Sequence, residues 1–428
     1  MKLGSLLSTS TGSRFRRNFL KVARANLIAM ALPILATPIL TRLFTPADYG
    51  TLAVFTSVLA LLVSFCTWRF DWALPNAKTM TMAASVFVSG GIVLAAVCLA
   101  LVLAVPFVLA IPAFEETSIG QLGYFLFLLP VALIGVGLRD MFGGWFVRQG
   151  DLTAVSRATI AQSATNVVVG IGTGITRAGA VGLIAATVIA AWAGIGMLLR
   201  QAGRDFVSAL WLVDLSSLRA AVRRYGRHAT WSTLVSIVNA ASLTAPILVL
   251  AYFYLPLEVG WYALMARLVG APVGVLTSAL ARSFWSQAAD HARAREIAEL
   301  STLYRRTTFR LALACIPVII GCLAGPFFVG PLLGQAEWGG AGYVLAAMVP
   351  FFVGSILFSP TNHLVVLDMQ HMQLLVDVTR LALVMLSIVA ASQLGLGIVS
   401  AVFLASSSSL VGHAILFFLH LRVHKSHE

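Results

Sequence analysis

The stretch RLFTPADYGTLAVF, residues 42–55, decides the fold because a related stretch recurs later in the chain. PILTRLFTPADYGTLAVF at 38–55 aligns with PILVLAYFYLPLEVGWYAL at 246–264. The two share Pro-Ile-Leu and, after a two-residue gap, Pro, an acid and Gly at equal spacing. Downstream, WRFDWALP at 68–75 holds the place of ARSFWSQ at 281–287. Three matches in the same order, about half a chain apart, indicate an internal duplication.

The composition is that of an integral membrane protein. The 428 residues are 59% hydrophobic and 11% charged, with a mean hydropathy of +0.92. A soluble protein carries about 25% charged residues, so these charges are too few to cover a solvent-facing surface. The apolar runs are long and rich in Leu, Ala and Val, which predicts an all-α membrane protein and not a β-barrel.

The apolar runs predict about 12 transmembrane helices, because each run is near or above the ~20 residues that cross a bilayer. Six spans in each half would enter the membrane the same way up. The predicted architecture is therefore two pseudo-symmetric six-helix bundles around a central cavity. The spans are expected at 22–43, 49–68, 82–111, 120–138, 153–176, 179–199, 228–254, 259–281, 309–333, 341–361, 373–393 and 396–420.

Basic residues orient the chain. With the N-terminus in the cytoplasm, all of the 29 Lys and Arg residues except Arg42, Arg177 and Arg267 lie on the inner side. This asymmetry satisfies the positive-inside rule, and it explains the net charge of +13 without a nucleic-acid partner. The expected layout is a basic cytoplasmic tail at 1–21, an N-terminal lobe at 22–199, a cytoplasmic linker at 200–227, a C-terminal lobe at 228–420 and a cytoplasmic tail at 421–428.

The repeated motif has the pattern of a helix start. Thr45 suits the N-cap, Pro46 the first helical position, and Asp48 the third, where its carboxylate can reach free backbone N–H groups. Glu258 repeats the acid in the second copy. Two interpretations of Asp48 and Glu258 stay open: capping at the outer surface, or a proton or cation site.

Some arginines lie within or at the edge of the predicted membrane spans, where a charge costs free energy. Arg267 is nine residues after Glu258, ~13 Å along a helix, which places it near mid-membrane. An Arg there costs ~2.5–3.5 kcal/mol on insertion scales. It is therefore expected to bind substrate, to pair with an acid on another helix, or to extend outward along the helix. Arg69 and Arg282 hold related repeat positions at the inner membrane edge.

Arg24, Arg69 and Asp71 also have two interpretations. They are either orientation signals or part of a cavity cluster, where forked arginine contacts would suit a phosphate or pyrophosphate. Arg139 and Asp140 are predicted as inner-end residues or a local pair. No metal spacing, catalytic constellation, P-loop or dinucleotide fingerprint is present, so neither an enzyme nor a cofactor is expected.

RLFTPADYGTLAVF followed by RFDWALP resembles the N-terminal signature of Wzx-type polysaccharide flippases. These belong to the multidrug/oligosaccharidyl-lipid/polysaccharide (MOP) exporter superfamily, and the resemblance is strongest over residues 20–80. It implies translocation of undecaprenyl-pyrophosphate-linked O-antigen or exopolysaccharide repeat units from the cytoplasmic to the periplasmic leaflet. It also implies the inner membrane of a Gram-negative bacterium, with a polysaccharide polymerase and chain-length proteins as partners.

The same resemblance suggests site residues. Related lipid II flippases line their cavity with arginines of the first, second and eighth helices, and family members couple to H⁺ or Na⁺ gradients. By helix and depth, the comparable substrate-binding residues here are Arg24, Arg69, Arg267 and Arg282. The acids available for ion coupling are Asp48, Asp71 and Glu258.

Two other functions stay open. A drug or cation exporter of the same superfamily would favour acids in the N-terminal lobe, where arginine dominates here. A membrane polysaccharide polymerase or ligase would carry a large periplasmic loop with polar catalytic residues, and the predicted outer loops are short.

Overall fold

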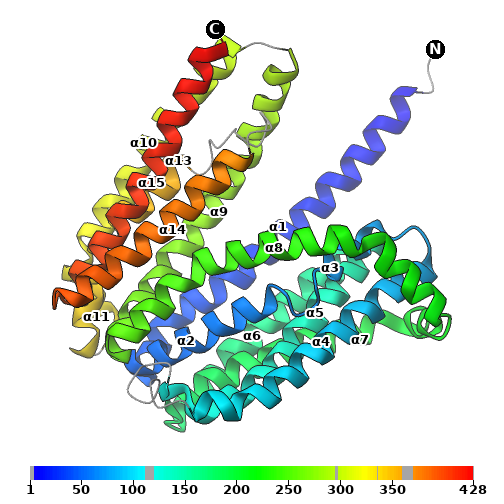
Figure 1. Ribbon diagram of the computed structural model, residues 1–428, viewed down its shortest axis with the longest axis horizontal. Coiled ribbons are helices and arrows are strands. Elements are labelled where there is room, and N and C mark those ends of the chain that lie inside the picture. The colour runs from blue at the N-terminus through cyan, green and yellow to red at the C-terminus, as the bar shows by residue number, and fades with distance from the viewer. Residues whose placement is uncertain (1–3, 111–119, 295–296, 335, 359–369, 428) are drawn as a thin grey trace. The chain divides into compact units, whose positions relative to one another are not determined.

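The protein, seen in a computed structural model, is built from helices throughout its described residues (Figure 1). The structure describes residues 4–110, 120–294, 297–334, 336–358 and 370–427, and for some helix residues, such as 4–23 and 416–427, the backbone alone. The chain forms two compact units. Unit 1 comprises Met1–Phe44 and Val54–Thr244, and unit 2 comprises Thr45–Ala53 and Ala245–Glu428. Two long helices, α2 and α8, contribute to both.

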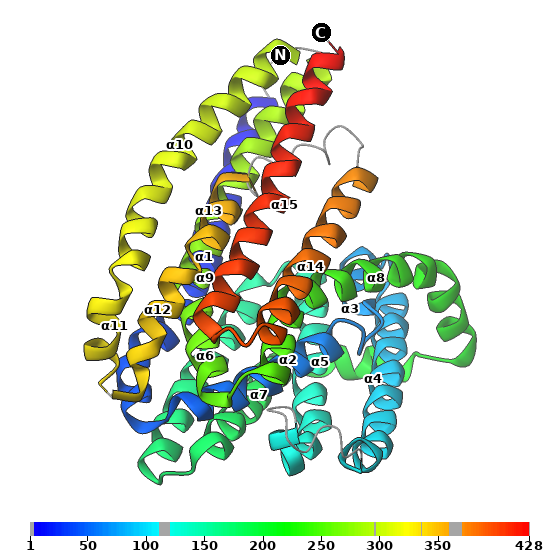
Figure 2. The same ribbon diagram turned by 60° about the vertical axis from the view of Figure 1, so that its left-hand side comes forward.

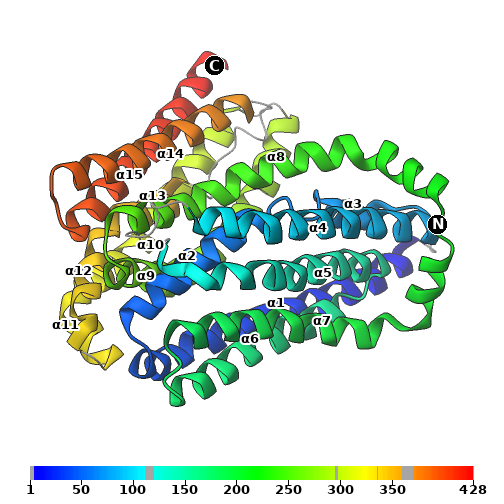
Figure 3. The ribbon, with the colours of Figure 1, turned by 60° about the horizontal axis from the view of Figure 1, so that its bottom comes forward.

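Unit 1 is a bundle of long helices. Helix α6 packs on α1 and α7, and α5 packs on α4 and α7, so these five helices run alongside one another (Figure 3). Its elements are α1 (Gly4–Leu43), α2 (Pro46–Val63), α3 (Phe70–Ala73), η1 (Leu74–Asn76), α4 (Met80–Leu109), η3 (Gly120–Phe127), α5 (Leu128–Gln149), α6 (Leu152–Ile175), α7 (Gly179–Trp211) and α8 (Leu215–Phe253).

Unit 2 is built around a helical hairpin. Helices α14 and α15 pack against each other, and α13 lies on α15 and α10 (Figure 2). Its elements are α9 (Pro256–Ala294), α10 (Ile297–Leu323), α11 (Gly325–Leu333), η4 (Ala336–Trp338), α12 (Gly339–Ala347), α13 (Val349–Phe358), α14 (Gln370–Gln393) and α15 (Ile398–His427).

The helices identify a multi-pass membrane protein. Within the described residues, nine helices are long and apolar enough to cross a membrane, and α12 with α13, bent by 42°, makes up to ten. Helices α6 and α9 cover two further predicted spans. The predicted span 309–333 divides between α10 and α11 at Ala324, because Pro326 starts a new helix there.

The repeated motif folds as a capped helix start in both copies. The Thr45 N–H and hydroxyl each donate to Asp48 Oδ2 at 2.9 Å, and the Asp48 N–H donates back to Thr45 Oγ1 at 3.3 Å. This reciprocal arrangement is a capping box. In the second copy the Leu255 N–H donates to Glu258 Oε2 at 3.1 Å. The capping interpretation of both acids is confirmed.

The two copies meet through their glycines, within unit 2. A Cβ atom on Gly50 would overlap the carbonyl oxygen of Pro256, and a Cβ on Gly260 would overlap the carbonyl oxygen of Pro46. The first turns of α2 and α9 therefore touch backbone to backbone. This reciprocity agrees with the duplication, since equivalent residues make equivalent contacts across a local two-fold relation.

Candidate functional site

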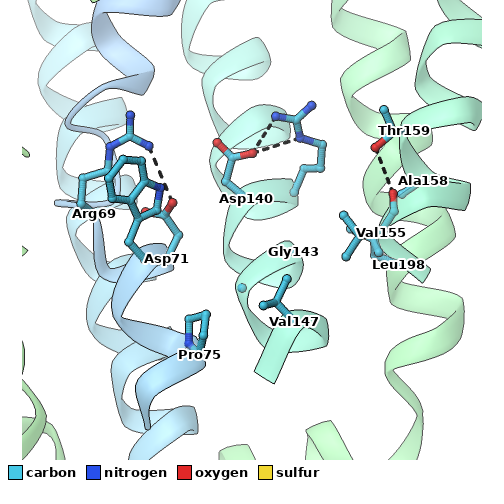
Figure 4. A pocket seen from close by; sticks show the side chains of 13 residues that line it. Arg69, Asp71, Pro75, Asp140, Gly143, Val147, Val155, Ala158, Thr159 and Leu198 are labelled. Carbon is cyan, nitrogen blue, oxygen red and sulfur yellow. Dashed lines mark hydrogen bonds and ion pairs between the residues drawn. The ribbon is translucent and has the colours of Figure 1, made fainter. Parts of the chain in front are cut away.

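A cavity of about 520 Å³ lies within unit 1 and gathers four charged side chains. Arg69 and Asp71 reach it from the α3 segment, Asp140 from α5 and Thr159 from α6 (Figure 4). The lining residues are Arg69, Asp71, Trp72, Pro75, Arg139, Asp140, Gly143, Gly144, Val147, Val155, Ala158, Thr159 and Leu198. Two arginines and two aspartates thus line one cavity together with apolar side chains.

A tight chain reversal places Arg69 at this cavity. Helix α2 ends at Val63, and Trp68 and Arg69 then adopt left-handed backbone angles, with φ of 50° and 52°. Two successive non-glycine residues in this region cost of order 1–3 kcal/mol each. The side chains hold them there. The indole of Trp68 donates to Thr230 Oγ1 at 3.1 Å, and Arg69 donates from Nε to Ser236 Oγ at 2.9 Å and also from Nη2.

Asp71 is the buried acid of the cavity. Its side chain is 6% exposed, its Oδ1 accepts the Thr67 hydroxyl at 2.7 Å, and its Oδ2 lies 3.7 Å from Arg69 Nη1. Burial raises the pKa of this carboxyl above its ordinary value; the Thr67 hydrogen bond opposes the shift, and the negative charge of Asp140 adds to it. Asp71 is thus an acid that takes a proton more readily than an exposed one.

Arg139 and Asp140 form a second charge pair on α5. Arg139 donates from Nη2 and Nε to Asp140 Oδ1, at 2.6 and 3.1 Å, and from Nη1 to Gln162 Oε1 on α6 at 2.7 Å. The predicted local pair is confirmed. Its place in the cavity was missed. Two adjacent opposite charges interrupting an apolar run were the available signal, but sequence spacing does not relate α5 to the α3 segment.

Gly144 sets the distance between these two segments. A Cβ on Gly144 would lie 2.5 Å from the Asp71 carbonyl oxygen, whereas a Cβ on Gly143 would meet nothing within 4 Å. We expect Gly144→Ala to push the α3 segment away and to lower the unfolding free energy by about 1–3 kcal/mol. Gly143→Ala, one residue away in the same helix, is the matched control and should unfold like the wild type in a denaturant titration. Equal stability of the two variants would contradict the assigned contact.

Arg24 and Arg267 are not among the residues that line this cavity. Arg24 is exposed on α1, and Arg282 lies on α9 with its side chain outside the described part. Arg267 is exposed on α9 and makes no hydrogen bond or ion pair with any described residue. It is close enough to interact electrostatically with buried Tyr49, whose ring packs edge-on to Trp338 at 5.5 Å. Of the predicted site residues, the structure therefore brings Arg69 and Asp71 together in one cavity.

A sequence comparison identifies the family. Residues 39–341 match a family described as "Polysaccharide biosynthesis protein". The chain belongs to this family. The match begins within the first copy of the repeated motif and spans most of the chain, so it covers both copies and the whole charged cavity of this polysaccharide biosynthesis protein. No curated protein matches the chain.

Solved structures of transporters share the fold. The inward closed lipid II flippase MurJ superposes with a TM-score of 0.65 at 11% identity, covering 94% of this chain and 87% of MurJ. An inward-facing multidrug resistance MATE transporter of the MOP superfamily gives 0.63 at 14% identity, with 94% and 95% covered. A MATE transporter of Vibrio cholerae gives 0.58 at 18% identity, with 98% of each chain covered. The predicted all-α, two-lobed fold of this superfamily is confirmed.

Proposed function

We propose that this protein is a flippase that moves undecaprenyl-pyrophosphate-linked oligosaccharide repeat units from the cytoplasmic to the periplasmic leaflet of a bacterial inner membrane. One observation carries the proposal: the chain belongs to a polysaccharide biosynthesis family and has the fold of MurJ and the MATE transporters. A pathway that assembles surface polysaccharide needs its lipid-linked intermediate on the periplasmic leaflet. A protein with a transporter fold suits the step that moves this intermediate across the membrane. The protein then acts by alternating access and is not an enzyme.

The arginines support an anionic headgroup as the recognised part of the substrate. Arg267 is exposed on α9, nine residues after Glu258, and has no carboxylate partner among the described residues. An unpaired guanidinium at such depth is costly unless it faces water or an anion. Arginine also forms forked contacts with phosphate oxygens. Arg24, Arg69 and Arg282 are proposed to take part in the same recognition.

Asp71 is the acid best suited to proton coupling. It is buried in the charged cavity, and its proton would change the net charge beside Arg69 and Arg139. Asp48 and Glu258 serve as helix caps, so their ion-coupling role, which stays a prediction, would require breaking those caps. With both termini cytoplasmic, the α3 segment lies at the inner side of the membrane, where cytoplasmic substrate enters.

The test uses a strain that depends on this gene for its surface polysaccharide. Deleting the gene should remove the polysaccharide and leave lipid-linked repeat units in the cytoplasmic leaflet. We expect Arg267→Ala and Arg282→Ala each to lower export at least about tenfold, the effect of about 1.4 kcal/mol on a rate-limiting barrier. Repeat-unit export is measured by labelling surface glycan in intact cells.

Arg177→Ala is the matched control, because Arg177 is also exposed and also outside the predicted cytoplasmic segments. It should export normally at equal protein level. Normal export by both Arg267→Ala and Arg282→Ala would exclude the anion-binding site. Unchanged polysaccharide in the deletion strain, with altered drug resistance, would instead favour the alternative of a drug or cation exporter.

A further inference from the structure

A second polar cluster lies inside unit 2, in the hairpin of α14 and α15. Asp377 and Arg380 on α14 form an ion pair at 3.2 Å, and Arg380 Nη1 lies 2.6 Å from Nε2 of His413 on α15. His413 is 4% exposed and lies 15 residues after the start of α15, ~22 Å along the helix. All three residues therefore lie within candidate membrane spans, toward the ends that are predicted to be cytoplasmic, where ionisable side chains are functional candidates.

The hydrogen bonds fix the protonation state of the imidazole. A guanidinium has only donors, so Arg380 Nη1 must donate and Nε2 of His413 must accept. The other ring nitrogen, Nδ1, lies 2.8 Å from the Ser409 carbonyl oxygen, which can only accept. His413 is thus neutral, with its proton on Nδ1, and Nε2 offers a lone pair that a second proton would use.

The site is built to hold these side chains together. A Cβ on Gly354 of α13 would lie 2.9 Å from His413 Nδ1, and a Cβ on Gly412 would lie 2.7 Å from Arg380 Cγ. Phe358 of α13 stacks on the imidazole with ring centroids 6.4 Å apart. Both glycines therefore leave room for the pair in an otherwise apolar interface.

The helices packed around α15 differ in the ionisable groups that they carry. Helix α13 has none, and α12 has Tyr343 alone, which is exposed. Helix α10 touches α15 weakly and carries Glu299, Tyr304, Arg305, Arg306 and Arg310 as well as the buried thiols of Cys315 and Cys322. Toward the other end of the hairpin, Ser387 of α14 and Ser408 of α15 share a hydrogen bond at 2.6 Å. Among the described side chains, Arg380 is the charge that acts directly on His413, and Asp377 is the ion-pair partner of Arg380.

We propose that His413 is a proton-binding site in the second unit, gated by Arg380. A proton that enters adds to the Nε2 lone pair, which breaks the hydrogen bond from Arg380 Nη1 because two N–H donors then face each other. Arg380 keeps its ion pair with Asp377, and His413 Nδ1–H keeps its bond to the Ser409 carbonyl. Release of the proton restores the contact between α14 and α15. The proposal rests on the proposed transport function, since it assigns a coupling proton to that transporter.

The test measures proton binding without any transported substrate. Full-length protein is reconstituted in vesicles of phosphatidylethanolamine and phosphatidylglycerol on a solid-supported membrane, and a step from neutral to acidic pH is applied. A proton that binds inside the membrane produces a transient charge movement. We expect His413→Gln to lose one component of this transient, because a Gln oxygen can accept from Arg380 but cannot take up a proton.

Three further variants make the result specific. His228→Gln, at an exposed histidine of α8, should keep the wild-type transient. Asp71→Asn should keep the part of the charge movement that is lost in His413→Gln. Arg380→Lys, which keeps the charge on a shorter arm, should move the midpoint to higher pH by about one unit. A folded His413→Gln variant with a wild-type transient overturns the proposal. Because no lipid-linked sugar is present, failure of the flippase assignment would leave this result unaffected.

Discussion

Gly260→Ala should destabilise the protein by about 3 kcal/mol, at the upper end of overpacking effects. The added methyl group would overlap the carbonyl oxygen of Pro46, and backbone cannot move aside as a flexible side chain does. Both Pro46 and Gly260 lie in the first turns of long helices, so relief requires shifting α2 or α9 as a whole. Unfolding in increasing mole fractions of SDS measures the loss.

Two companion variants make this prediction specific. Gly50→Ala should show a similar loss, because its Cβ would overlap the carbonyl oxygen of Pro256 in the reciprocal contact. Gly270→Ala, further along α9, meets nothing within 4 Å and should be neutral or slightly stabilising, since alanine favours a helix over glycine. A Gly260→Ala variant as stable as Gly270→Ala would refute the close approach.

These glycines show how far the sequence predicts the fold. The repeated Pro, acid and Gly predicted the duplication and both caps, because capping depends on neighbours three residues apart. Each glycine also contacts the helix that carries the other glycine. This contact is tertiary, so the spacing of residues along the sequence could not predict it. The charge deficit predicted a membrane protein, since that property depends on composition alone.

The candidate site was predicted only in part for the same reason. Arg69 and Asp71 are two residues apart, so their association was accessible from the sequence. Arg139 and Asp140 were recognised as a local pair but not as part of the cavity, since α5 reaches it through packing. His413 and Arg380 lie on separate helices, and nothing in the sequence marks their contact.

Asp71→Asn should give a folded protein that no longer responds to a proton gradient. Asparagine keeps the size of the side chain and an oxygen that can accept the Thr67 hydroxyl, but it cannot release a proton. If Asp71 carries the coupling proton, the acceleration of flipping by an imposed pH gradient, measured in vesicles with a polyprenyl-pyrophosphate sugar, should fall by about tenfold or more. An unchanged acceleration would remove Asp71 from the coupling step.

The same variant has a stability signature whose sign follows from burial. Burial raises the pKa of Asp71 in the folded protein, so its contribution to stability is present below about pH 4 and is lost as the pH rises through that raised pKa. Asp71→Asn avoids this loss, and its advantage in unfolding temperature over the wild type should grow from acidic to neutral pH. Asp151→Asn is the matched control, because Asp151 is an exposed N-cap of α6 and asparagine caps equally well. A constant difference across this pH range would show that the Asp71 carboxyl is not shifted by burial.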